Sequence, residues 1–179
     1  YEPENVRSTI NVLKSAGYFP FIPESKKSNK PLCCGRTYLS NGLIDQAKLE
    51  AENILTTFYP YLKNGVSVVG LEPSCILSFR DELPSLIKNE TADLLKDNSF
   101  TFEELLVKNI KKLKFKRFNE KILVHGHCHQ KAFDVVKPIE QILNYIPGLK
   151  FETIETSCCG MAGAFGYDKN TYDISMKMA

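Results

Sequence analysis

The alternation of apolar and polar positions divides the chain into amphipathic helices and short apolar strands. Residues 4–16 place Val6, Ile10 and Leu13 near one face and are followed by Gly17, which predicts a helix with a glycine stop. A stronger helical pattern begins at Leu43 and ends at 64–65, an Asn-Gly pair. Apolar runs at 18–22, 66–71, 121–124 and 151–154 predict strands, and the β-branched run at 66–71 is of the buried parallel type.

The middle of the chain has a helical pattern with no clear strand. Residues 76–87, 91–97 and 100–113 each have helical spacing, so we expect a set of packing helices here. Near the end, Asp168 is placed to cap a helix that runs through Met178. We divide the chain into a first half (1–90), a helical insertion or connection (91–120) and a second half (121–179).

The order of elements occurs twice. Helix, glycine stop, strand, Cys-Cys-Gly, Gly-containing turn and helix follow one another in both halves. The two motifs, Cys33-Cys34-Gly35 and Cys158-Cys159-Gly160, lie 125 residues apart (158 minus 33). This repeat predicts an α/β fold of two pseudo-repeated β/α halves, with parallel strands and helices on both faces.

Composition and charge exclude several classes of protein. The chain of 179 residues is 43% hydrophobic and 25% charged, as in ordinary globular domains, and its net charge of +2 does not indicate a nucleic-acid partner. No apolar run approaches the roughly 18 residues of a membrane span, so we expect no transmembrane segment. No signal peptide opens the chain. The chain begins at Tyr1 and ends inside a predicted helix, so we expect a fragment of a longer protein.

The six cysteines indicate metal or cluster binding in a reducing cytoplasm rather than a disulfide framework. Adjacent cysteines cannot easily bridge each other, but they can present two thiolates to one ion. Strand ends in a parallel sheet bring distant residues to one edge. We therefore expect one site of Cys33, Cys34 and Cys75 and a second of Cys128, Cys158 and Cys159.

The sequence pattern leaves two alternatives for the metal in these sites. Several thiolates suit either zinc or an iron–sulfur cluster, and the spacing matches neither zinc ribbons nor bacterial ferredoxins. By the repeat, each site would gain a further cysteine, one before Tyr1 and one near position ~200.

The three histidines of the chain lie together at 125, 127 and 129, beside Cys128. They share one face if the strand continues through His129, and a turn after Val124 would break that rule. A histidine here can be a metal ligand, a proton donor or a partner of Cys128, although a purely structural role is commoner. We favour His127 and His129 as the catalytic pair.

Two charged residues lie next to the first cysteine group. Glu72, three residues before Cys75, either contacts the site or simply begins a helix beside Pro73. Arg36 directly follows the first Cys-Cys-Gly and can compensate thiolate charge or bind a carboxylate.

Four stretches resemble the cysteine-rich CCG domain family, which includes one subunit of heterodisulfide reductase and the iron–sulfur subunits of glycolate oxidase and anaerobic glycerol-3-phosphate dehydrogenase. They are PLCCGRTYLSNGLIDQAK, GLEPSCILSFRDE, VHGHCHQKA and ETSCCGMAGAFGYD. The chain is more closely similar to the C-terminal region of large fused FAD-linked oxidases that also carry ferredoxin-type clusters.

The resemblance implies an iron–sulfur module of the [4Fe–4S] type, or zinc in some relatives, held by the six cysteines. It implies electron relay from FAD, in a missing part of the parent protein, during oxidation of 2-hydroxy acids such as D-lactate, glycolate or D-2-hydroxyglutarate. The implied partners are flavin and ferredoxin-like domains of the same parent chain, with an unknown electron acceptor. The parent enzyme would be cytoplasmic or peripheral to the inner membrane, and the fragment would be inactive alone.

This sequence departs from the family pattern at one position. Glu72 stands where the first cysteine of a C-x-x-C pair would be, which puts a five-thiolate first site in doubt. Two other functions stay open: a structural zinc or docking domain, and a redox domain that uses the vicinal thiols of Cys158 and Cys159.

Overall fold

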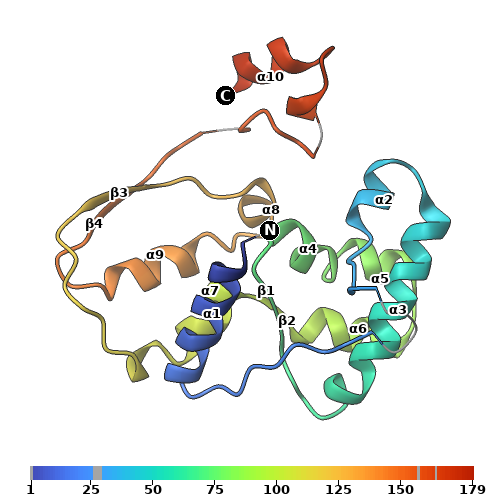
Figure 1. The fold of residues 1–179 in the computed structure, drawn as a ribbon, viewed down its shortest axis with the longest axis horizontal. Coiled ribbons are helices and arrows are strands. Elements are labelled where there is room, and N and C mark those ends of the chain that lie inside the picture. Colours follow the sequence, from blue (N-terminus) through green and yellow to red (C-terminus); the bar gives the residue numbers. More distant parts are fainter. Residues whose placement is uncertain (1, 26–29, 157, 164) are drawn as a thin grey trace.

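The computed structural model describes residues 2–25, 30–156, 158–163 and 165–179. The α helices are α1 (Pro3–Ser15), α2 (Arg36–Ser40), α3 (Ile44–Leu62), α4 (Pro73–Ser78), α5 (Glu82–Leu86), α6 (Glu90–Asn98), α7 (Phe102–Lys108), α8 (Cys128–Ala132), α9 (Lys137–Asn144) and α10 (Tyr172–Met178). The strands are β1 (Val68–Gly70), β2 (Ser99–Thr101), β3 (Lys121–Val124) and β4 (Lys150–Thr153), and two 3₁₀ helices are η1 (Ile110–Lys112) and η2 (Phe165–Tyr167). Figure 1 shows their arrangement.

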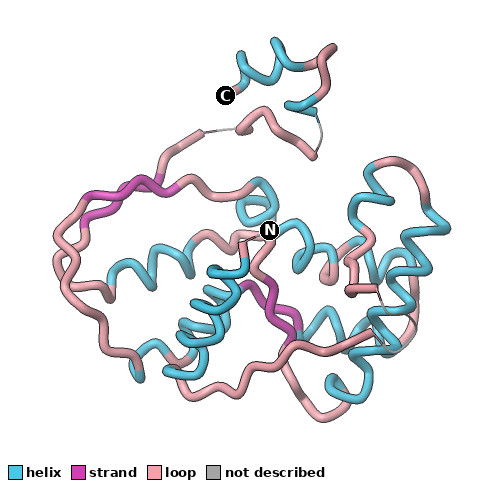
Figure 2. The backbone as a smooth tube through the Cα atoms, viewed as in Figure 1, coloured by secondary structure: helices cyan, strands magenta, loops and turns pink. Residues whose placement is uncertain are grey.

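The strands form two separate parallel pairs. β1 pairs with β2, with Val69 opposite Phe100, and β3 pairs with β4, with Ile122 opposite Phe151. Figure 2 shows the pairs as two magenta segments in different parts of the molecule. Helices α4 and α7 pack against the β1–β2 pair, so the expected α/β fold with parallel strands is confirmed, although each sheet has only two strands in the described part of the chain.

The prediction that the middle of the chain is purely helical is wrong at β2. Ser99 and Thr101 are buried, and their backbone completes the pair with β1. The Ser99 hydroxyl donates to the carbonyl of Leu95 (2.6 Å), and Thr101 forms a capping box with Glu104 at the start of α7. These hydroxyl contacts hold three extended residues between two helices.

The predicted strand at 18–22 is also wrong. The segment has no regular structure, and Phe19 is 94% exposed. Pro20 has no N–H to donate to a strand ladder, and Pro23, three residues later, also lacks this donor. Together with α1 and β1, the segment lines an apolar cavity of about 500 Å³.

The main hydrophobic core lies under α3, α4, α5 and α6. Leu77 and Leu95 are fully buried, and Ile54, Ile76 and Leu83 pack in the same cluster. The second half contributes Val135 to this core. Because α4 packs against α8 as well, the core ties the cysteine-bearing helix of the first half to that of the second.

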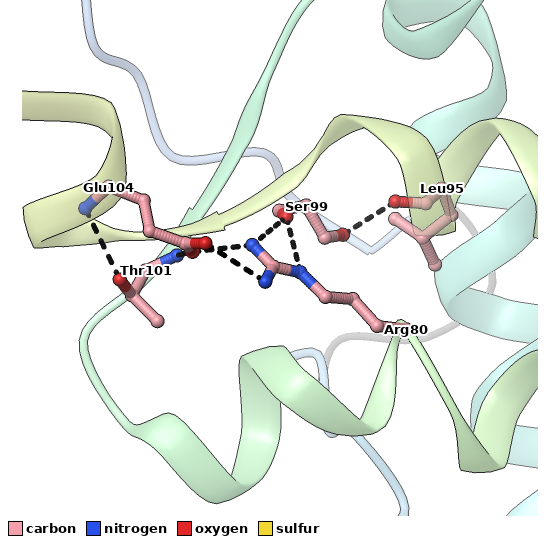
Figure 3. Close-up of polar contacts among 5 residues, drawn as sticks. All are labelled: Arg80, Leu95, Ser99, Thr101 and Glu104. Carbon is pink, nitrogen blue, oxygen red and sulfur yellow. Dashed lines mark hydrogen bonds and ion pairs between the residues drawn. The ribbon is translucent and has the colours of Figure 1, made fainter. Parts of the chain in front are cut away.

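Arg80 connects three elements next to this core, as Figure 3 shows. Its Nε and Nη2 donate to the Ser99 carbonyl at 2.8 and 2.6 Å, and Nη1 donates to Glu104 at 3.1 Å. Glu104 also accepts the N–H of Thr101 (2.9 Å). Arg80 therefore fixes the chain after α4 to β2 and to the beginning of α7.

The C-terminal helix α10 begins later than expected, and the prediction that Asp168 caps it is wrong. Thr171 is its N-cap residue, whereas the Asp168 carboxylate accepts the N–H of Asn170 (2.8 Å) in the preceding turn. α10 packs against η2, and Figure 1 shows this segment lying apart from α8 and the β3–β4 pair. Ile174 and Met176 on α10 are more than half exposed.

Candidate metal centre

The first Cys-Cys-Gly is a sharp turn that begins a helix. Gly35 has φ of +78° and is the N-cap residue of α2. Its N–H donates to Sγ of Cys33 (3.5 Å). A Cβ on Gly35 would lie 3.2 Å from the carbonyl oxygen of Ala47 on α3, in a backbone region that other residues rarely adopt. Glycine is therefore required for the chain to turn this close to α3.

Cys34 and Cys75 meet at this turn. Their Sγ atoms lie 2.9 Å apart, although the residues are 41 positions apart in sequence. Cys34 directly precedes Gly35 and α2, and Cys75 lies in the first turn of α4. The α2 and α4 helices pack against each other, and both thiols are half-buried. The structure thus brings together two of the three cysteines expected in the first site.

The sulfur contact polarises this pair. The Cys75 thiol beside Cys34 lowers the pKa of Cys34 to about 6, and the backbone N–H of Arg36 and the Arg36 charge act in the same direction. The same contact raises the pKa of Cys75, with burial adding to the effect. Burial raises the pKa of Cys33 as well. The charge of Cys33 adds to the increase in the pKa of Cys75. One thiolate is therefore stabilised at the turn, as a ligand for a soft metal requires.

The two charged neighbours of the group have protein partners. Glu72 is the N-cap residue of α4, and its carboxylate accepts the N–H (3.2 Å) and the hydroxyl (2.7 Å) of Ser74. Arg36 forms an ion pair with Glu82. Of the two roles open to Glu72 from the sequence, the structure shows the helix cap.

The histidine loop turns after β3, so the three histidines do not share the face that a continuous strand would give. His127 is the N-cap residue of α8, and its Nδ1 accepts the N–H of His129 (3.1 Å). Gln130 Oε1 accepts the N–H of His127 (3.1 Å), which completes a capping box. Because Nδ1 is an acceptor, the neutral ring carries its proton on Nε2.

Gln130 is a structural residue of this loop that the sequence pattern did not lead us to expect. It is buried, and it fixes the loop that carries His127 and Cys128. The signal was present, since a glutamine three residues after a polar N-cap is the spacing of a capping box.

The other two histidines have different surroundings. His125 Nε2 lies 3.1 Å from the Thr156 hydroxyl. The His129 ring stacks on His127, with 5.2 Å between ring centroids. His129 Nδ1 is buried and has no hydrogen-bond partner among the residues that the structure describes. His127 and His129 therefore form a pair, whereas His125 belongs to the strand end.

The His127–His129 pair lies on the side of the first cysteine group. α8 packs against α4, which carries Cys75. Burial lowers the pKa of His127; the Glu72 charge opposes this shift, and His129 and Arg36 reinforce it. Glu72 and Arg36 belong to the first half, so a histidine of the second half lies within electrostatic reach of the first cysteine group.

We expect His127→Ala to destabilise the protein by about 1 kcal/mol, because the helix loses its N-cap acceptor. His127→Asn replaces the Nδ1 acceptor with an amide oxygen, which can accept the same N–H, and should retain most of the stability. Urea unfolding of both variants measures the difference. Equal losses in the two would show that the cap hydrogen bond contributes nothing.

The second Cys-Cys-Gly repeats the turn of the first. Gly160 also has φ of +78°, and its N–H donates to Sγ of Cys158 (3.3 Å). Ser175 of α10 donates its hydroxyl to the Gly160 carbonyl (2.8 Å). Each turn is therefore closed by a helix that follows it in sequence, α3 in the first half and α10 in the second.

Gly160→Ala should separate this turn from α10, because a Cβ at Gly160 would lie 2.4 Å from the Ser175 carbonyl oxygen. The left-handed backbone adds a further cost of about 1 to 2 kcal/mol. Hydrogen exchange at Ser175 and Met178 should speed up in this variant. Gly163→Ala is the matched control, since Gly163 also has positive φ but, among the described residues other than its chain neighbours, no atom lies within 4 Å of the position that an added methyl group would take. Equally fast exchange in both variants would contradict the close packing.

The structure does not assemble a complete ligand set. Among the described residues, no three His, Cys, Asp or Glu side chains come together closely enough to hold one ion. Cys128 begins α8 and is exposed, and Cys159 is exposed beside half-buried Cys158. The thiolate–thiol pair of Cys34 and Cys75, with Cys33 beside it, fits a soft metal or cluster in the chemistry of its donors.

No family model matches the chain, and no solved structure matches it. Within the described residues, no helix has the length and apolar character needed to cross a membrane.

Similar proteins are found among iron–sulfur proteins and dehydrogenases. The chain is 27% identical over 177 residues to the C subunit of anaerobic glycerol-3-phosphate dehydrogenase of Escherichia coli K12, covering 97% of this chain and 43% of that protein. It is 26% identical over 160 residues to an uncharacterized iron–sulfur protein of Methanocaldococcus jannaschii, covering 88% and 29%. It is 23% identical over 193 residues to D-2-hydroxyglutarate dehydrogenase of Haemophilus influenzae, covering 98% and 18%.

The chain thus spans less than half the length of each of these relatives. Their names and the paired cysteine turns are consistent with an iron–sulfur domain of the CCG type.

Proposed function

We propose that the chain is the iron–sulfur module of an FAD-linked oxidoreductase acting on 2-hydroxy acids of the D-lactate, glycolate or D-2-hydroxyglutarate type. In this role it relays electrons from the flavin to an acceptor. The observation that carries the proposal is the 2.9 Å contact between Sγ of Cys34 and Sγ of Cys75, at a helix start in each case. The dehydrogenase relatives support the reaction class.

Each cysteine has a place in this proposal. Cys33, Cys34 and Cys75 hold one cluster, and Cys128, Cys158 and Cys159 hold the other. When bound, a [4Fe–4S] cluster supplies one-electron transfer. The protein contributes backbone N–H donors, such as that of Arg36 to the Cys34 sulfur, which stabilise negative charge on sulfur.

The histidine pair has a protonic role in this proposal. His127 keeps an Nε2–H donor because its Nδ1 is bound to the helix backbone. His129 stacks on it and leaves a buried nitrogen without a partner among the described residues. Both rings are placed to donate or accept a proton where the two halves meet, which an acceptor that takes up protons with electrons requires.

The parent protein would supply the remaining parts. We place the flavin and ferredoxin-like domains in the same parent chain, with residues 1–90, 91–120 and 121–179 as two cysteine halves and their connection. We place the parent in the cytoplasm or at the inner face of the inner membrane.

The half-reactions of the parent enzyme test the relay. With Cys34→Ser, the hydroxy acid should still bleach the flavin at the wild-type rate, whereas turnover with an external acceptor should be lost. Stopped-flow absorbance measures the first step and steady-state dye reduction measures the second. Undiminished acceptor turnover in Cys34→Ser and in Cys158→Ser, with lowered stability, would favour a structural zinc domain and contradict the relay.

A further inference from the structure

We propose that Cys34 and Cys75 form a reversible disulfide in the metal-free protein, and that this bond closes the first cysteine group until it is reduced. The proposal rests on the proposed function only in treating these two residues as metal ligands. The disulfide itself follows from the positions of the sulfur atoms.

The two thiols are almost in bonding position. Their Sγ atoms are 2.9 Å apart, and a disulfide requires about 2.05 Å, so the sulfurs need to approach by less than about 1 Å. Cys34 lies next to the N-terminus of α2 and Cys75 lies in α4, and these helices pack against each other. Because α2 and α4 already pack against each other, we expect a change of side-chain rotamers to close this gap.

The other thiols compete poorly for this bond. Cys33 is adjacent to Cys34, and bridging adjacent cysteines strains the peptide between them. Its sulfur also accepts the N–H of Gly35 (3.5 Å). Cys158 has the same backbone contact with Gly160 (3.3 Å) and the same adjacent neighbour, Cys159. The vicinal pairs are therefore less suited to disulfide formation than the pair that the fold brings together across 41 positions.

Hydrogen peroxide is a sufficient oxidant for this step. One of the two sulfurs attacks a peroxide oxygen and the O–O bond breaks. The attacking sulfur becomes a sulfenic acid, and the other oxygen departs as water. The second sulfur then attacks the sulfenic sulfur, the S–O bond breaks, and a second water leaves with the thiol proton. Two thiols thus supply two electrons, and one peroxide becomes two waters. A dithiol reductant reverses the bond by thiol–disulfide exchange.

Closure has a direct consequence for metal binding. Sulfur atoms joined in a disulfide are no longer thiolates, and the thiolate is the form that binds metal. The oxidised protein should therefore not bind iron at the first cysteine group, and a reductant should restore iron binding there.

Peptide mapping of the metal-free protein tests the proposal. The protein is stripped with a chelator under reductant, freed of reductant, treated with one equivalent of hydrogen peroxide, alkylated and digested with trypsin without reduction. Cys33 and Cys34 share a peptide that ends at Arg36, and Cys75 lies in one that ends at Arg80. We expect these two peptides as the main linked species, and their separation after dithiothreitol treatment.

Matched variants identify which cysteine sulfurs form the disulfide. Cys33→Ser should keep the link, whereas Cys34→Ser and Cys75→Ser should abolish it. The proposal is overturned if Cys34 and Cys75 are recovered alkylated, if Cys34→Ser keeps the link through Cys33, or if Cys158 and Cys159 are oxidised first. Mapping requires no iron, so a protein that forms the link but never binds iron would refute the proposed function alone. A protein that binds iron but fails to form the link would refute this inference alone.

Discussion

Arg80→Ala is expected to lower the free energy of unfolding by about 3 kcal/mol, because it leaves a largely buried carboxylate and a carbonyl without their donor. The side chains of Arg80 and Glu104 are only 16% and 18% exposed. Arg80 is bound to both Ser99 and Glu104, so its loss also loosens the junction of β2 and α7 (Figure 3). Chemical denaturation measures the change. Arg7→Ala on the exposed face of α1 is the matched control and should stay within about 0.5 kcal/mol of the parent.

The Arg80–Glu104 pair also makes the stability of the protein depend on pH in the acid range. Burial would raise the pKa of Glu104, but the Arg80 hydrogen bonds and the Thr101 N–H outweigh it and hold the pKa below its usual value. A carboxyl with a depressed pKa contributes stability above its unfolded pKa and loses it as pH falls through the folded pKa. The difference between wild type and Glu104→Gln should therefore shrink on acidification from pH ~5 toward pH ~3. A constant difference across this range would show that the Glu104 charge is not involved.

Cys75→Ser is expected to remove the metal of the first cysteine group. A serine hydroxyl is a much poorer ligand for a soft metal than a thiolate, and Cys75 holds the sulfur that meets Cys34. If both groups are loaded, the variant should lose about half of the iron of the wild type, since one of two groups is disabled. Iron analysis after anaerobic reconstitution gives the ratio.

The control for this variant lies one residue away. Ser74→Ala removes a hydroxyl that is bound to Glu72 on the same helix turn, and it should retain the full iron content. Wild-type iron content in Cys75→Ser would exclude Cys75 as a ligand. An equal loss of iron in Ser74→Ala would instead show that the helix start, rather than the Cys75 sulfur, determines loading.

The sequence pattern was most informative where periodicity and glycine act together. Gly17 and Gly65 have positive φ and end α1 and α3 as expected. The strands at 121–124 and around 151 also form, and they pair in parallel. Local chemistry was harder to read. The apolar residues around Pro20 suggested a strand, but proline cannot donate to a strand ladder and no strand forms there. At β2 the pattern was helical, but the hydroxyl groups of Ser99 and Thr101 stabilise an extended segment.

The candidate site depends on long-range packing that no local pattern contains. The repeat of Cys-Cys-Gly predicted two equivalent turns, and both have the same glycine φ and the same N–H to sulfur contact. The sequence predicted that Cys34 and Cys75 meet at strand ends, but the strand before Cys33 does not form, and the contact comes instead from the packing of α2 against α4. The position of His127 near Glu72 and Arg36 follows from the packing of α4 on α8, for which the sequence offered no signal.

Anaerobic iron and acid-labile sulfide analysis, combined with electron paramagnetic resonance of the reduced parent protein, tests most directly whether these cysteines hold an electron-transfer cluster. We expect iron and sulfide in equal amounts and a signal that weakens in Cys34→Ser and Cys75→Ser. Stoichiometric zinc without iron, in protein purified anaerobically and in full length, would contradict the proposed role of the cysteine groups.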